Sequence, residues 1–169
     1  LMDEVLSKDN LNQAYLQVTR NKGASGVDDM TCEEVKDYLK VHGNELISQI
    51  KSREYKPLPV RRVEIPKPNG GVRKLGIPTV IDRIIQQALV QKLTPIFEPT
   101  FSEYSYGFRP NRRCQNAIDR ALELTNQGYE WIIDLDLEKF FDNVPQDKLI
   151  RIVDNVSKDS DITWLIHKY

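Results

Sequence analysis

The chain has 169 residues, of which 40% are apolar and 29% are charged, enough for one domain with a hydrophobic core. No apolar run approaches the roughly 20 residues that a membrane-spanning helix needs. The first ten residues, LMDEVLSKDN, lack the basic and apolar regions of a signal peptide. Two isolated cysteines and two histidines exclude a His/Cys metal cluster and favour a reducing compartment such as the cytoplasm.

The net charge of −1 hides an uneven distribution of charge along the chain. Residues 51–113 hold 13 Lys and Arg against 5 Asp and Glu, a local charge of +8, whereas the remainder carries −9. Such a block favours a polyanionic partner bound on one face. By charge alone, a solvated basic face is an equally good interpretation.

The N-terminal third is predicted to be helical. Apolar residues at helical spacing predict a helix over 11–18. Thr31 and Glu34 fit a capping box, which predicts the start of a second helix. Gly43 is expected to end that helix, and Asn44 is expected to cap the next one.

A β-hairpin is predicted next, from VRRVEIP and VRKLGIP on either side of the turn PNGG. A long amphipathic helix over 79–97 should follow, and then the aromatic and basic loop FSEYSYGFRPNRR. Further along, we expect a helix over 115–124, a strand over 131–137 and two more helices over 146–153 and 160–169.

The predicted strand carries two carboxylates in an apolar setting. Asp134 and Asp136 are two residues apart and therefore share one face of a strand. Neighbouring carboxylates repel unless a cation lies near them, and Mg²⁺ is commonly held by one or two carboxylates together with substrate phosphates. The alternative is a strand whose acidic face is simply solvated.

Two other groups of residues favour a nucleotide site. Lys67, Arg73 and Lys74 flank the hairpin turn, where they could reach a triphosphate. Phe141 follows Asp136 by five residues and could form an apolar floor beside a sugar. For Phe140 and Phe141, ordinary core packing is the alternative.

Four segments together resemble a known family. They are NKGASGVDDMT, IPKPNGGVRKLGIPTVIDRIIQQAL, FEPTFSEYSYGFRPNRRCQNAI and WIIDLDLEKFFDNVPQDKL, and they are similar, in this order, to successive blocks of group II intron reverse transcriptases, the intron-encoded maturases. Related bacterial enzymes of the retron or defence type share parts of this set and remain the alternative subfamily.

The resemblance implies an α+β fold, the fingers and partial palm of a right-hand polymerase. Residues 1–43 would form an N-terminal extension, residues 44–128 the fingers with the β-hairpin and the long helix, and residues 129–169 the first part of the palm with a short antiparallel sheet. The implied activity is RNA-directed DNA synthesis by two-metal phosphoryl transfer.

The resemblance also implies roles for individual residues. Asp136 would bind two Mg²⁺ ions, with help from the backbone carbonyl of Leu137. Lys67 and Arg73 would grip the triphosphate of a dNTP, and Phe141 would exclude a 2′-hydroxyl. The expected contacts with the RNA template are Arg109, Arg112, Arg113 and Lys74.

Three acidic or basic residues keep a structural interpretation. For Arg109, an anchor that holds its loop to the palm is as good an interpretation as a template contact. Asp134 is interpreted as a structural acid beside the metal ligand, and Asp142 as a turn or pairing residue.

The expected partners are an RNA template with a DNA primer, dNTPs and a group II intron RNA. No membrane partner is expected, and a homodimer through exposed palm edges remains an option. The family's Tyr-x-Asp-Asp block has no counterpart here, because the single adjacent pair, Asp28–Asp29, precedes a capped helix. The chain is therefore expected to be a fragment that is inactive alone. An RNA-binding splicing cofactor on a polymerase scaffold is the alternative function.

Overall fold

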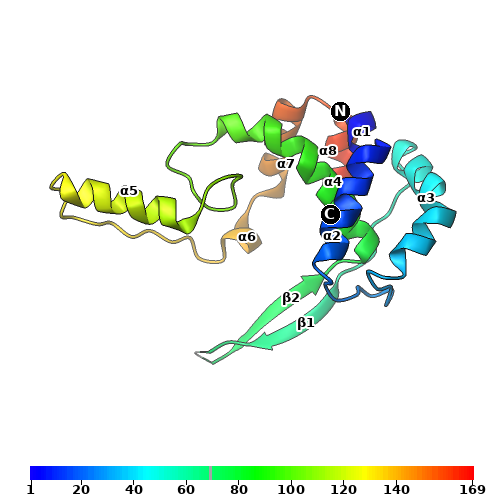
Figure 1. Cartoon of the computed structure of the whole chain (residues 1–169), viewed down its shortest axis with the longest axis horizontal. Coiled ribbons are helices and arrows are strands. Elements are labelled where there is room, and N and C mark those ends of the chain that lie inside the picture. Colours follow the sequence, from blue (N-terminus) through cyan, green and yellow to red (C-terminus); the bar gives the residue numbers. More distant parts are fainter. Residues whose placement is uncertain (69) are drawn as a thin grey trace.

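A computed structural model describes residues 1–68 and 70–169. Its elements follow the chain as α1 (Met2–Val5), α2 (Lys8–Arg20), α3 (Val35–Lys51), β1 (Arg61–Pro66), β2 (Val72–Ile77), α4 (Val80–Phe97), the 3₁₀ turn η1 (Glu98–Thr100), α5 (Cys114–Asn126), α6 (Phe140–Asn143), α7 (Gln146–Ser157) and α8 (Ser160–His167). Helices dominate, and the two-stranded hairpin projects from them (Figure 1). The predicted fold class, helix-rich α+β with a β-hairpin, is confirmed.

The hydrophobic core forms around the N-terminal half of α4. This helix begins at a Thr79 cap, whose side-chain oxygen accepts a hydrogen bond from the Asp82 N–H at 3.1 Å. Its apolar residues recur at helical spacing and are buried against α1 and α2, and Ile162 and Leu165 of α8 belong to the same core. The buried residues of α4 in this core are Val80, Ile81, Ile84, Ile85, Ala88 and Leu89. No helix in the described part of the chain is long and apolar enough to cross a bilayer.

The start of α3 matches the prediction, but its end does not. The Thr31 N–H donates to Glu34 Oε2 at 2.9 Å, and the Glu34 N–H donates to Thr31 Oγ1 at 3.3 Å, which is the predicted capping box. The predicted helix end at Gly43 is wrong, because α3 runs unbroken from Val35 to Lys51. An internal glycine costs about 1 kcal/mol, whereas burying a side chain such as Ile50 contributes about 2 kcal/mol. Burial of the apolar face of α3 therefore stabilises the continuous helix by more than the internal glycine destabilises it.

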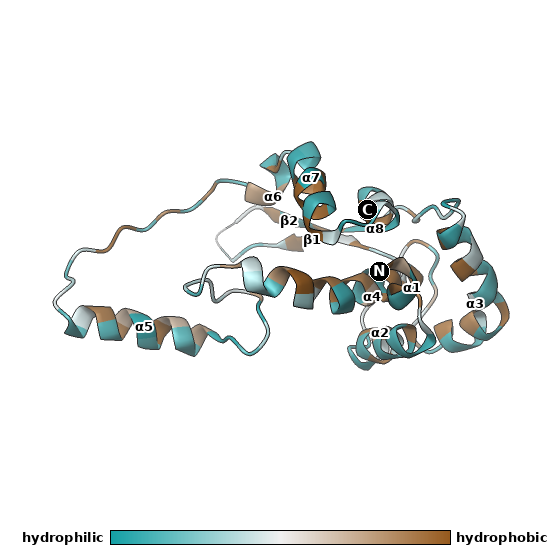
Figure 2. Cartoon of the chain, turned by 90° about the horizontal axis from the view of Figure 1, so that it is seen from above, coloured by the Kyte–Doolittle hydropathy of each residue, from teal (hydrophilic) through white to brown (hydrophobic). Residues whose placement is uncertain are grey.

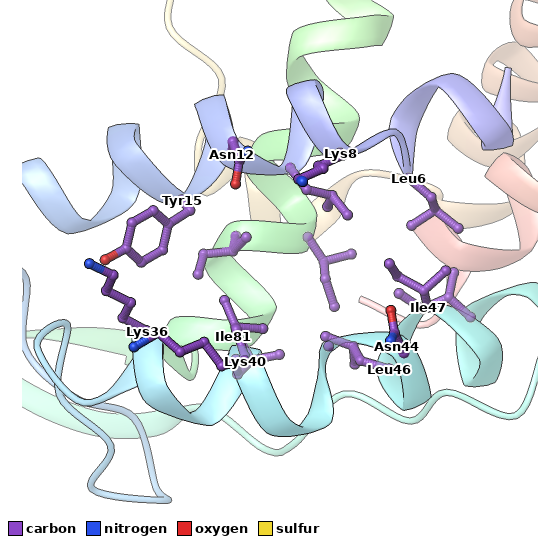
Figure 3. Close-up of a pocket in the computed structure, with 16 residues that line it drawn as sticks. Leu6, Lys8, Asn12, Tyr15, Lys36, Lys40, Asn44, Leu46, Ile47 and Ile81 are labelled. Carbon is purple, nitrogen blue, oxygen red and sulfur yellow. The ribbon is translucent and has the colours of Figure 1, made fainter.

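A cavity of about 640 Å³ lies between α2, α3 and α4 (Figure 3). Its lining is mainly aliphatic, with the side chains of Lys8, Lys36 and Lys40 among the lining residues. None of the residues that line it is an acid, so this cavity is not where the predicted carboxylate chemistry lies.

Residues from α5 to α6 form an arm that extends away from the helical core. In both views, α5 stands apart from the other helices (Figures 1 and 2). The apolar side chains of Ile118 and Leu122 are more than half exposed. The helix is nevertheless the one predicted, and it ends before Gly128, whose φ of 95° suits glycine.

The strand predicted over 131–137 is not formed. The segment is extended and exposed, with Trp131 at 94% and Leu135 at 88% of their full accessibility. A strand exists only through hydrogen bonds to a neighbouring strand, and no described residue pairs with this segment. The expected short palm sheet is therefore absent from the described residues, and the only sheet among them is the hairpin.

Candidate active site

The register of the hairpin places the basic side chains near its tip on two opposite faces. Ile65 pairs with Arg73, and Glu64 pairs with Lys74, so Arg73 and Lys74 point to opposite sides. Past the end of β1, the Lys67 N–H donates to the Gly71 carbonyl at 3.0 Å, which continues the ladder. By alternation, Lys67 lies on the Arg73 face. The two residues predicted to bind a triphosphate thus share one side, and the predicted template contact Lys74 lies on the other.

The turn of the hairpin is close to the one predicted. Gly70 and Gly71 both have positive φ, 83° and 84°, a conformation that a side chain would disfavour. The Gly70 N–H donates to the Lys67 carbonyl at 3.1 Å. Asn69, the second residue of the predicted PNGG turn, lies outside the described residues.

The acidic segment presents its carboxylates to solvent. Asp134 and Asp136 are both exposed in the extended stretch before α6. Among the described residues, no group of three or more acidic, His or Cys side chains could hold a metal ion. Mg²⁺ prefers about six oxygen ligands and often takes only one or two from carboxylates. Asp136 and the Leu137 carbonyl supply oxygen donors of the right kind, but they make only part of such a site.

The two phenylalanines after the acidic segment differ in their surroundings. They begin the single-turn helix α6, whose preceding residue Lys139 has a left-handed φ of 47°. Their ring centroids lie 5.5 Å apart at 62°, an edge-to-face pair. Phe140 is 50% exposed and Phe141 is 90% exposed. Core packing therefore does not account for Phe141 in this structure.

Arg109 faces its own loop rather than solvent. Its side chain is only 8% exposed, and its guanidinium forms an ion pair with Glu98 at 2.8 Å. It also donates to the carbonyls of Ser102, at 2.5 Å, and Ser105, at 3.0 Å. Because these partners occupy both ends of the guanidinium, the geometry favours the anchoring interpretation over a template contact.

The other two arginines of this loop are more accessible. Arg112 donates to the Glu103 carbonyl and lies 5.5 Å from the centre of the Tyr106 ring, a cation–π arrangement. Arg113 is exposed at the start of α5, where its backbone N–H donates to Asn116 Oδ1 at 2.8 Å. Of the three arginines, Arg113 has the side chain best placed to meet a phosphate.

One buried acid was not singled out by the sequence. Asp82, in the first turn of α4, is 1% exposed and accepts hydrogen bonds at the base of the hairpin. The signal in the sequence was Thr79-x-x-Asp82, a capping pattern at the start of an apolar helix. That pattern predicts a helix start, but it does not predict contacts with the hairpin.

The predicted site residues thus fall into two groups, a cationic face of the hairpin and an exposed segment from Asp136 to Phe141. No hydrogen bond or ion pair among the described residues joins Lys67 or Arg73 to Asp136.

The family model for reverse transcriptase (RNA-dependent DNA polymerase) matches residues 65–169, from the hairpin to the last residue. The chain belongs to this family of polymerases, and the predicted resemblance is confirmed.

Relatives of the chain include a group II intron-encoded protein and a protein of Escherichia coli. The chain is 36% identical over 159 residues to the group II intron-encoded protein LtrA of Lactococcus lactis, covering 92% of this chain and 26% of that protein. It is 40% identical over 154 residues to protein YkfC of Escherichia coli, covering 88% of this chain and 40% of that protein. The chain thus spans less than half the length of these relatives.

A solved structure has the same fold. A partial Cas6-RT-Cas1–Cas2 complex matches 99% of this chain and 27% of that chain, with a TM-score of 0.61 and 21% sequence identity. At this identity the match concerns the fold alone.

Proposed function

We propose that this chain is the fingers and first palm segment of a group II intron reverse transcriptase, which extends a DNA primer on an RNA template. The observation that carries the proposal is the order of parts within the matched region. A hairpin with Lys67 and Arg73 on one face precedes the exposed block from Asp136 to Phe141. The complete activity would belong to a longer protein that contains this segment, as the lengths of the relatives suggest.

Each residue of this site would have a separate task. Asp136 and the Leu137 carbonyl would hold Mg²⁺, which when bound neutralises phosphate charge and activates the primer hydroxyl. Lys67 would place a positive charge beside the triphosphate, and Arg73 would donate two parallel hydrogen bonds to it. Phe141 would lie beneath the sugar, and Lys74, Arg112 and Arg113 would contact the template backbone.

The proposal is tested by primer extension on an RNA template with dNTPs and Mg²⁺. We expect the longer protein to synthesise DNA and the 169-residue chain to be inactive, because the chain supplies only one of the carboxylates that the reaction needs. DNA synthesis by the 169-residue chain would contradict the assignment of a partial site. A longer protein that extends no primer would contradict the proposed activity itself.

Replacing Phe141 tests the sugar-binding role. We expect Phe141→Ala to reduce discrimination against rNTPs by about 10- to 100-fold, the selectivity that shape alone can give an apolar pocket. The measurement is kcat/KM for dCTP and CTP on the same primer–template. Phe140→Ala is the matched control, because this neighbouring ring is half-covered, and it should leave the ratio nearly unchanged. A Phe141→Ala enzyme with unaltered sugar selectivity would refute the assignment.

A second function concerns intron RNA. The exposed Arg113 and the basic block between residues 51 and 113 are suited to bind RNA phosphates, and LtrA is encoded by a group II intron. We propose that the longer protein also binds its intron RNA and promotes splicing.

The remaining proposals concern the compartment and the assembly. Both cysteines, Cys32 and Cys114, are free thiols, which fits the reducing cytoplasm of a bacterium. The homodimer through exposed palm edges stays a prediction.

A further inference from the structure

A buried carboxylate joins the hairpin to the helical core. Asp82 Oδ2 accepts hydrogen bonds from the Thr79 hydroxyl at 2.7 Å and from the Leu58 N–H at 3.3 Å. Its Oδ1 accepts from the Tyr55 hydroxyl at 2.5 Å and from the Tyr169 hydroxyl at 3.3 Å. A buried carboxylate is costly unless it is paired or fully hydrogen-bonded, and here both oxygens have two donors.

These donors come from both ends of the hairpin. Tyr55 and Leu58 lie on the chain that runs into β1, and Thr79 lies on the chain that leaves β2. The Asp82 side chain therefore links the segment before β1 to the segment after β2, at the point where both meet α4. The chain is also closely packed at this base, since a Cβ placed on Gly76 would lie 2.8 Å from Val60 Cγ2.

The protonation of the two phenols suits this arrangement. Burial raises the pKa of Tyr55 far above its ordinary value, and burial also raises the pKa of Tyr169. Both hydroxyls keep their protons well above neutral pH and can donate to Asp82.

A small change in the angle of the hairpin at its base would produce a larger displacement at its tip. Lys67 lies six positions after Arg61, the first residue of β1, a span of roughly 20 Å at about 3.3 Å per residue. A tilt of about 10° at the base would move the tip by about 3.5 Å over that span. Hydrogen bonds weaken steeply when donor and acceptor move apart by such a distance, so the triphosphate would be held less tightly.

We propose that Asp82 is a positioning residue for nucleotide binding, which fixes the angle at which the hairpin presents Lys67 and Arg73 to the triphosphate. Asp82 touches neither of these residues and acts through the backbone segments that lead into β1 and out of β2. The inference rests on the proposed function, because it assumes that the hairpin face binds a dNTP.

The test is Asp82→Asn in the longer protein, assayed by steady-state primer extension. Asparagine keeps the size of the side chain, but its amide nitrogen cannot accept the hydrogen bonds that one carboxylate oxygen now accepts. We expect KM for dNTP to rise about tenfold or more. The kcat at saturating dNTP should change by less than about twofold, because Asp136 is unaltered. The Kd for primer–template should rise by a smaller factor than KM for dNTP, because Arg112 and Arg113 lie outside the hairpin.

Asn10→Ala is the matched control for a general loss of stability. Asn10 is another buried polar residue against α4, where its Nδ2 donates to the Val5 carbonyl at 2.8 Å and to the Ala88 carbonyl at 3.0 Å. It lies away from the base of the hairpin. Its replacement should lower the melting temperature without raising KM for dNTP.

Two further variants keep the test decisive. If Asp82→Asn does not fold, Tyr55→Phe removes one donor to the same carboxylate and should give a smaller rise in KM. In a Lys67→Ala/Arg73→Ala background, adding Asp82→Asn should raise KM no further, since residues that act through one contact are not additive.

The outcomes separate the inference from the proposed function. If the Lys67/Arg73 double variant raises KM but Asp82→Asn behaves like Asn10→Ala, Asp82 is only a structural residue and the inference is overturned. If the double variant leaves KM unchanged, the hairpin does not bind the nucleotide, and both ideas fail together. A full additive effect of Asp82→Asn in the double-variant background would also overturn the positioning role.

Discussion

Asp136→Ala in the longer protein should reduce DNA synthesis by about 10³-fold or more. The proposed metal ligand is worth several kcal/mol of charge stabilisation in the transition state, and each 1.36 kcal/mol corresponds to a tenfold change in rate. RNA binding should be nearly unaffected, because the substitution removes a negative charge and no phosphate contact. The measurements are single-turnover primer extension and filter binding of the RNA.

Asp134→Ala is the matched control for this experiment. Asp134 lies two residues earlier in the same exposed segment and has the same charge. It carries no metal role in the proposal, so its replacement should change the rate far less. Equal losses from the two substitutions would mean that local charge, and not a specific ligand, accounts for the effect.

The same variant separates the two proposed functions. Intron splicing by an Asp136→Ala protein should continue, because splicing would depend on RNA binding and not on the polymerase site. Loss of splicing with intact RNA binding would show that the two functions share Asp136 and would contradict their separation.

Arg73→Ala should raise KM for dNTP by about 10- to 100-fold, because a hydrogen bond to a charged group contributes about 1.5–3 kcal/mol. Lys67→Ala should act in the same direction, since the register places Lys67 on the same face of the hairpin. The measurement is KM for a single dNTP on a fixed primer–template at constant ionic strength.

Lys74→Ala is the matched control on the opposite face of the same strand. It removes the same charge one residue away, next to Glu64 in the register. We expect it to weaken template binding and to reduce the salt dependence of that binding, with little change in KM for dNTP. A rise in KM after Lys74→Ala that equals that of Arg73→Ala would mean that the two faces of the hairpin are not functionally distinct.

The sequence by itself determined the elements whose signals are local. The capping box of Thr31 and Glu34 and the hairpin with its turn glycines both appear as predicted. Each depends on residues within a few positions of one another, so the chain encodes them without its tertiary contacts. The family blocks, read in order, also sufficed to assign the chain to the reverse transcriptases.

Other features were decided only by contacts between distant parts of the chain. The inward stripe of α3 overrides the helix stop expected at Gly43, and Glu98 turns Arg109 away from solvent. Asp82 was predicted only as part of a helix, yet Tyr55 and Leu58 from across the hairpin complete its hydrogen bonds.

The segment 131–137 is a further case in which the local sequence did not suffice to predict the structure. Its residues have strong strand propensity, but without a neighbouring strand among the described residues it stays an extended and exposed segment. Propensity favours an extended backbone, whereas a strand also needs hydrogen bonds to a partner that its own sequence does not contain.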